Sequence, residues 1–140
     1  VGVSQLSGGS RTSVGGYADK VAAENSEQFD ISDNRSLDEI VGWLLELGYI
    51  PSFCTACYRE GRTGDRFMSL AKRGLIGNCC APNALMTLGE YLEDYASPAT
   101  RAKGEKMIAK ELKNIPSEKV RRITEERMRD IAQGKRDFRF

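Results

Sequence analysis

Apolar residues recur at helical spacing in the middle and last thirds of the chain, which predicts helices there. In the first of these stretches they share one face: Leu37, Ile40, Val41, Leu44 and Leu47. Ser36 and Glu39 have the spacing of a capping box, and Gly48 is placed to end the helix in a left-handed cap. We therefore expect a helix that begins after Ser36 and ends at Gly48. An extended segment interrupted by a proline should follow at 49–53.

Start and stop signals predict further helices downstream. They are a short helix at 65–72 that Gly74 ends, a helix at 84–96 with Asn83 as its N-cap, a helix from Pro98 to about 113, and a last helix from Ser117 to Gly134. Residues 54–64 are expected to be irregular and residues 135–140 to form a tail. The alternation at 1–7 predicts a strand, followed by a glycine-rich loop. A lone strand needs a partner, so we expect it to pair with a sheet built from residues outside this chain.

The composition is that of a soluble globular domain. Of 140 residues, 40% are hydrophobic and 29% are charged. No apolar run approaches the roughly 20 residues of a membrane span, and no signal peptide is apparent. The chain contains no histidine, which excludes catalysis by a histidine base and any zinc site with a histidine ligand. Because it does not begin with Met, we interpret it as part of a longer protein. Without a secretion signal, we expect that protein to be cytoplasmic.

The charges are unevenly distributed. Residues 1–100 carry 8 basic and 13 acidic side chains, whereas residues 101–140 carry 13 basic and 7 acidic ones. A basic region can bind nucleic acid or an acidic partner, but acidic residues are interleaved with the basic ones here. We therefore interpret the region as a solvated helical surface, and we expect neither nucleic acid nor a membrane as a partner.

Four cysteines are the candidates for chemistry. Cys54 and Cys57 form a Cys-x2-Cys pair, and Cys80 follows after 22 intervening residues, with Cys79 directly before it. Paired cysteines at this spacing turn both sulfurs toward one metal. Adjacent cysteines point in different directions, so three ligands are more natural than four. A structural zinc site closes four positions, whereas an iron–sulfur cluster can work with three, and spacing alone leaves both open, beside a redox dithiol or inert thiols.

Two groups of basic residues adjoin candidate sites. Arg59, Arg62 and Arg66 follow the cysteine pair; they are suited to hold an anionic ligand or a negative cluster, or else to pair with nearby carboxylates. Upstream, Ser10, Arg11 and Thr12 lie between glycine pairs beyond the predicted strand. An arginine there can clamp a carboxylate with its two-pronged guanidinium, so these three residues are candidates for substrate binding. The alternative is a tight turn that needs glycine.

The chain resembles a known family at several motifs. Residues 6–12, 15–17 and 28–36 resemble the end of the radical SAM β/α barrel in the aromatic amino acid lyases. Residues 52–59 with 61–64 are similar to the C-terminal extension of the FeFe-hydrogenase maturase within that group. The Cys-x2-Cys-x22-Cys spacing matches the auxiliary-cluster signature of that maturase at Cys54, Cys57 and Cys80. The thiazole-pathway tyrosine lyase, which shares the barrel motifs, lacks these cysteines.

The resemblance implies a mainly α-helical chain. Residues 1–50 would be the last strand and closing loop of the barrel, and residues 51–140 a helical C-terminal domain with an iron–sulfur site. Cys54, Cys57 and Cys80 would bind an auxiliary 4Fe-4S cluster with an additional iron, with Cys79 as a neighbour. The full-length enzyme of this family uses S-adenosylmethionine and a second 4Fe-4S cluster. It cleaves tyrosine to p-cresol and dehydroglycine, and it yields carbon monoxide and cyanide bound to iron for the H-cluster.

The implied partners are tyrosine, a free cysteine or similar ligand on the open iron, and other hydrogenase maturation proteins. The Cys-x3-Cys-x2-Cys motif of the radical-generating cluster is absent from this chain, so the chain alone should be inactive. Two alternatives remain: the thiazole-pathway lyase, and a small zinc-stabilised helical module that binds an acidic partner through its basic region. Metal and sulfide analysis distinguishes a cluster from zinc.

Overall fold

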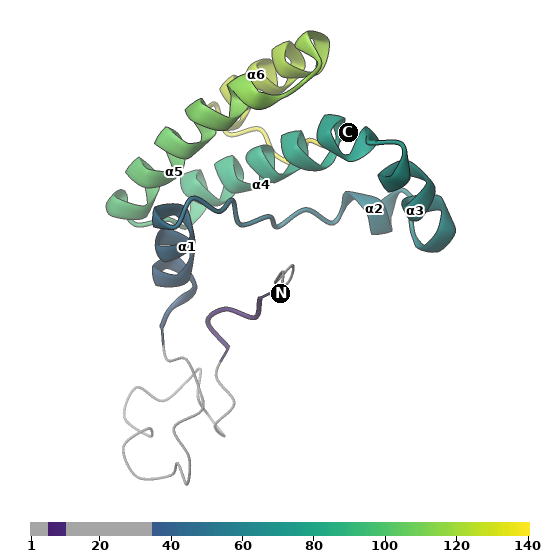
Figure 1. Ribbon diagram of the computed structural model, residues 1–140. Helices are drawn as coiled ribbons and strands as arrows, with labels where there is room; N and C mark the ends of the chain where they lie inside the picture. The colour runs from purple at the N-terminus through teal and green to yellow at the C-terminus, as the bar shows by residue number, and fades with distance from the viewer. Residues whose placement is uncertain (1–5, 11–34) are drawn as a thin grey trace, which may run out of the picture.

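The computed structural model describes residues 6–10 and 35–140, and helices dominate these residues (Figure 1). In order they are α1 (Leu37–Glu46), α2 (Ala56–Arg59), α3 (Gly64–Lys72), a 3-10 turn at Leu75–Asn78, α4 (Cys80–Asp94), α5 (Pro98–Glu111), a 3-10 turn at Leu112–Asn114, and α6 (Glu118–Ala132). The described residues contain no strand. Most of the strand predicted at 1–7 lies outside them, as do residues 11–34.

The start and stop signals of α1 are confirmed. Ser36 Oγ accepts a hydrogen bond from the Glu39 N–H at 3.3 Å, and Glu39 Oε2 accepts one from the Ser36 N–H at 2.7 Å. This capping box satisfies two backbone donors that the helix itself leaves unpaired. Gly48 has the expected left-handed backbone, with a φ of 83°. Gly74 and Gly134 likewise have positive φ after α3 and α6.

Two predicted boundaries near the cysteines are wrong. Residues 54–64 are not wholly irregular, because Ala56–Arg59 forms the single helical turn α2. Helix α4 begins at Cys80 rather than at residue 84, so Asn83 lies within its first turn and is not an N-cap. Pro82 does not prevent the earlier start, because the first helical residues have no intrahelical partner for their N–H groups.

Helix α4 is the centre of the molecule. It packs against α5 and α6, and α1 packs against α5 (Figure 1). Helix α1 lies near one end of α4 while α2 and α3 lie near the other, and the extended segment between α1 and α2 runs alongside. The buried core joins these elements: Val41, Leu45, Leu85, Leu88, Tyr91, Leu92, Met107, Ile108 and Ile115. This core holds α4 against α1 and α5.

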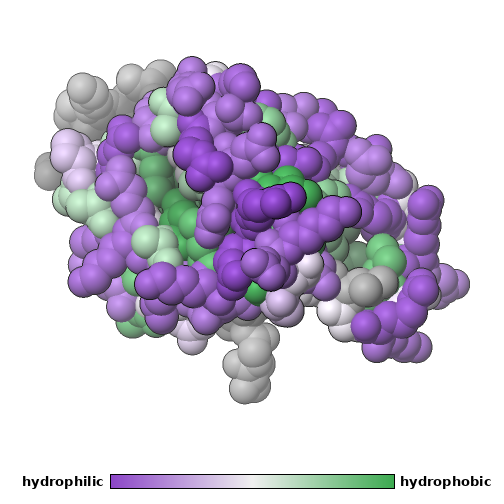
Figure 2. Space-filling model, turned by 90° about the horizontal axis from the view of Figure 1, so that it is seen from above, coloured by the Kyte–Doolittle hydropathy of each residue, from purple (hydrophilic) through white to green (hydrophobic). Residues whose placement is uncertain are grey.

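The surface is mostly polar. In the view of Figure 2, hydrophilic residues dominate and apolar residues show between them. Among the described helices, none combines the length and the apolar character needed to cross a membrane.

Candidate metal centre

Cys54 and Cys57 lie on either side of the start of α2. Thr55 is the residue before this four-residue helix, and Cys57 is its second residue. The Ala56 N–H points to Cys54 Sγ at 3.4 Å, and the Arg62 N–H donates to the Cys57 carbonyl at 2.7 Å. Upstream, the Phe53 ring stacks on Tyr91 of α4 with 5.0 Å between ring centroids.

Cys79 and Cys80 lie at the first turn of α4. Cys79 is its N-terminal flanking residue and Cys80 its first residue, and both are partly buried. Their sulfurs are 3.9 Å apart. The carbonyl of Cys79 accepts from the Asn83 N–H at 3.0 Å, so the position of Asn83 is tied to that of the cysteine pair.

The four thiols share one electrostatic environment. Burial, the charge and hydrogen bond of Cys79, and the charges of Cys57 and Cys54 together raise the pKa of Cys80 to about 11. Within the described residues, however, no three such side chains converge closely enough to hold a single metal ion.

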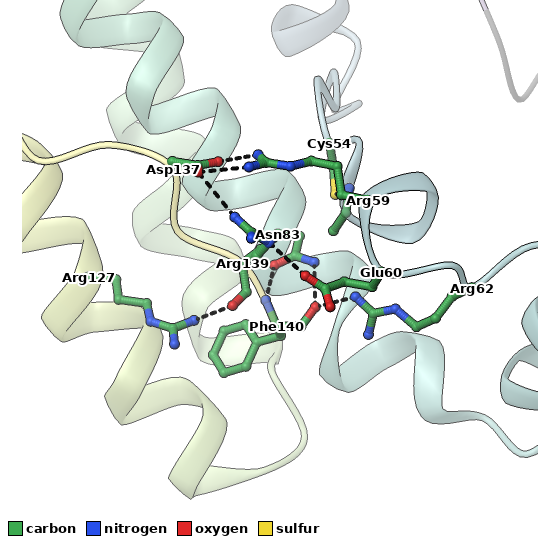
Figure 3. A network of polar contacts seen from close by, with 10 residues as sticks. Cys54, Arg59, Glu60, Arg62, Asn83, Arg127, Asp137, Arg139 and Phe140 are labelled. Atoms are coloured by element: carbon green, nitrogen blue, oxygen red, sulfur yellow. Dashed lines mark hydrogen bonds and ion pairs between the residues drawn. The ribbon is translucent and has the colours of Figure 1, made fainter.

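The polar residues after Cys57 contact the end of the chain, here called the C-terminal segment (residues 135–140). Arg59 makes a two-point ion pair with Asp137, in which Nη2 and Oδ2 are 3.0 Å apart (Figure 3). Arg139 Nε donates to Glu60 Oε1 at 2.9 Å, and Arg62 Nη2 donates to the Phe140 carbonyl at 2.6 Å. The hydrogen bond and charge of Arg139 hold the pKa of Glu60 below its usual value.

The carboxylate partners expected for these arginines are therefore only partly right. Arg59 forms an ion pair, but its partner is Asp137 from the far end of the chain, and Arg62 donates to the backbone of Phe140 instead of to a carboxylate. The buried Arg62 Nε has no hydrogen-bond partner, which leaves one guanidinium donor unsatisfied near the cysteine pair.

Asn83 is a further site residue that sequence reasoning assigned to another role. Its side chain is buried, with 3% exposed, and it binds the backbone of Phe140 at two points. Oδ1 accepts from the Phe140 N–H at 2.9 Å, and Nδ2 donates to the Phe140 carbonyl at 3.4 Å (Figure 3). The amide therefore joins the first turn of α4 to the C-terminal segment. No local pattern around Asn83 signals a partner 57 residues away.

The predicted substrate loop is described only at its edge. Ser10 is exposed, and its hydroxyl lies 3.0 Å from that of Ser7. Arg11 and Thr12 lie outside the described residues. Gly9 has a φ of 66°, and a Cβ there would lie 3.0 Å from the Leu37 nitrogen. This glycine is thus required both by its backbone conformation and by its close approach to α1.

A crystal structure of HydG, a maturase of the FeFe-hydrogenase, is similar to this chain over 99% of its length, with 52% sequence identity and a TM-score of 0.87. The chain spans 30% of the length of that HydG chain. No protein-family model matches the chain. No curated protein sequence matches it either.

Proposed function

Because this chain belongs to the HydG family of FeFe-hydrogenase maturases, we propose that it is the C-terminal, cluster-binding part of a radical SAM tyrosine lyase. The whole enzyme would use S-adenosylmethionine and a radical-generating 4Fe-4S cluster to cleave tyrosine to p-cresol and dehydroglycine. It would yield carbon monoxide and cyanide bound to iron, for assembly of the hydrogenase active site with the other maturation proteins. The observation that carries the proposal is the set of cysteines at α2 and at the start of α4.

We propose Cys54, Cys57 and Cys80 as the ligands of an auxiliary iron–sulfur cluster. Thiolates are the usual ligands of such clusters, and here they lie at α2 and at the first turn of α4. A cluster is larger than one ion and its cysteines bind different irons, so the sulfurs need not converge on a point. When bound, the cluster would supply an iron with a position free for an exogenous ligand, such as a free cysteine. The unpaired Arg62 Nε is suited to an anion at that place.

The substrate side of the proposal rests on Ser10, Arg11 and Thr12. An arginine between glycines can bind the carboxylate of tyrosine at two points, which lysine cannot do. In the whole enzyme these residues would follow the last strand of the barrel, at the face where β/α barrels bind substrates.

Replacement of single cysteines tests the ligand assignment. In the full-length protein, each of the four cysteines is changed to Ala, and the protein is reconstituted anaerobically. Iron and acid-labile sulfide are then measured beyond the amount held by the radical-generating cluster. We expect Cys54→Ala, Cys57→Ala and Cys80→Ala to lose the auxiliary cluster.

Cys79→Ala is the matched control, because it removes the neighbouring thiol from the same turn and should keep the auxiliary iron. Equal iron loss in Cys79→Ala and Cys80→Ala would show that the ligand assignment is wrong. One zinc per chain without additional sulfide would instead favour a zinc-stabilised helical module.

A further inference from the structure

We propose that the C-terminal segment is a positioning element for the auxiliary cluster. It holds the Cys57-bearing turn in place against the turn of α4 that carries Cys80, through the backbone of Phe140 and the side chains of Asp137 and Arg139. The inference rests on the proposed function, because it assumes a cluster bound between these two turns.

Helix α2 has few other supports. Within the described part of the chain, no other helix packs extensively against it. A four-residue helix is also too short to be stable by itself, because helix nucleation is unfavourable. Phe53 anchors the chain just before Cys54 by stacking on Tyr91. Downstream of Cys57, contacts with the C-terminal segment take over that role.

The segment binds three polar side chains that follow Cys57. Asp137 forms an ion pair with Arg59, and Arg139 forms one with Glu60. The Phe140 carbonyl accepts a hydrogen bond from Arg62. Each ion pair is partly exposed and weak by itself. They act together, however, because Arg139 also donates to Asp137 at 3.1 Å, which links the pairs into one network (Figure 3). The network constrains the turn more than any single pair does.

The same segment is fixed to α4 independently. The buried Asn83 amide binds both backbone groups of Phe140. Glu90 Oε1 accepts from the Asp137 N–H at 2.8 Å, and Asp94 pairs with Arg136 at 2.5 Å. The Phe140 carbonyl therefore accepts hydrogen bonds from both cysteine-bearing regions, through Arg62 and through Asn83. A shift of the segment would change the separation of Cys57 and Cys80.

The backbone of the segment also shows that its path is set by these contacts. Asp137 has a φ of 69°, which is unusual for a residue other than glycine. Such a conformation persists where surrounding contacts determine it. Arg127 of α6 also contacts the segment. Its guanidinium lies 4.3 Å from the centre of the Phe140 ring, and it donates a hydrogen bond to the Arg139 carbonyl at 3.1 Å.

Charge reversal at Arg139 tests the inference in the full-length protein. Arg139→Glu places a third carboxylate beside Glu60 and Asp137 and should detach the segment from the Cys57-bearing turn. We expect the auxiliary cluster to lose iron to a chelator about 10-fold faster, the size of effect that groups supporting metal ligands commonly have. We also expect faster amide hydrogen exchange at residues 56–62 in the metal-free protein.

Two further variants separate positioning from general loss of charge or stability. Arg101→Glu is the matched control, because Arg101 also joins two carboxylates, Glu93 and Glu105, but away from the cysteines. It should change neither measurement. Adding Glu60→Arg to Arg139→Glu restores an opposite-charge pair and should recover most of the iron retention.

The outcomes also separate the inference from the proposed function. Unchanged iron retention and exchange in Arg139→Glu, or an equal effect of Arg101→Glu, would overturn the positioning role while the auxiliary cluster stands. Absence of auxiliary iron and sulfide from the unaltered protein would overturn the proposed function and the inference together.

Discussion

Asp38 connects three helices through one carboxylate. Its Oδ1 accepts from the Ser97 N–H at 3.1 Å and from the Tyr91 hydroxyl at 3.3 Å, and its Oδ2 accepts from Thr100 Oγ1 at 3.0 Å. Burial raises the pKa of this carboxyl, but the hydrogen bonds from Ser97, Thr100 and Tyr91 outweigh it, and the pKa lies below 3.8. The carboxylate therefore stabilises the junction of α1, α4 and α5 in its ionised form.

The lowered pKa of Asp38 predicts a pH-dependent contribution to stability. At neutral pH, Asp38→Asn should lower the free energy of unfolding by about 1–3 kcal/mol, because the amide nitrogen cannot accept the hydrogen bonds that the carboxylate oxygen accepts. The ionised group's contribution is complete above its unfolded pKa, near 3.8, and is lost as the pH falls through the lower folded pKa.

The difference in stability between wild type and Asp38→Asn should therefore shrink below pH 3.8. Urea denaturation at a series of pH values, followed by circular dichroism, measures this difference. A difference that stays constant down to the acid limit would contradict the assignment. Because other carboxylates titrate in both proteins, the subtraction removes their effect.

At the residue scale, patterns within one turn were predictable from the sequence and distant contacts were not. Ser36 with Glu39, and Ser97 before Pro98, act as expected because capping involves backbone groups a few residues away. Asn83 was assigned to a cap for the same reason, yet its amide binds Phe140. A polar side chain within a helix can satisfy a distant backbone group, and only the tertiary fold reveals which one.

At the scale of elements, two glycines allow α4 to approach its neighbours, and they should respond differently to substitution. A Cβ at Gly104 of α5 would lie 2.5 Å from Leu92 Cδ1 and 3.0 Å from its Cγ. Leu92 is buried in the core and has little space to move. A Cβ at Gly89 of α4 would instead lie 2.5 Å from Cε, at the end of the flexible Met128 side chain. A thioether end can change rotamer to make room.

We therefore expect Gly104→Ala to destabilise the protein by about 1–2 kcal/mol net, because overpacking outweighs the gain of about 1 kcal/mol in helix propensity. Gly89→Ala should be neutral or more stable by up to about 1 kcal/mol. The midpoints of urea denaturation compare the two variants directly. Equal effects would show that side-chain flexibility at the contact does not decide the outcome.

Helices α1, α3, α5 and α6 were largely predictable, since each has a local start or stop signal. Two features depended on long-range contacts instead. The turn α2 is held by residues from the end of the chain, and α4 begins a turn early, where its first residues adjoin the cysteines. The cysteine set was identified by spacing and resemblance, and its assignment as ligands stays a prediction.

In the molecule as a whole, the uneven charge distribution is partly compensated by ion pairs within the chain. Basic residues after position 100 pair with acidic residues before it: Arg101 with Glu93, Lys103 with Glu46, Arg136 with Asp94, and Arg139 with Glu60. The tail predicted at 135–140 is not helical, as expected. Its ion pairs nevertheless bind it to the rest of the chain. These four basic residues therefore stabilise the fold.

The two activities proposed for the whole enzyme should be separable by mutation. Cleavage of tyrosine needs a radical and a bound substrate, which we assign to the barrel. Retaining carbon monoxide and cyanide needs a metal with a free position, which we assign to the cluster at Cys54, Cys57 and Cys80. Full-length protein with Cys54→Ala and Cys57→Ala should therefore still release p-cresol, but it should fail to deliver iron ligands and to activate hydrogenase.

Chromatography of p-cresol and maturation of hydrogenase in vitro, performed on the same preparations, measure the two activities. Cys79→Ala serves as the control and should retain both, because it removes a thiol without removing a proposed ligand. Loss of p-cresol from the double variant while its radical-generating cluster is intact would show that the two activities depend on one another. Full maturation by the double variant would show that Cys54 and Cys57 support only the fold, because the iron complex would then be delivered without them.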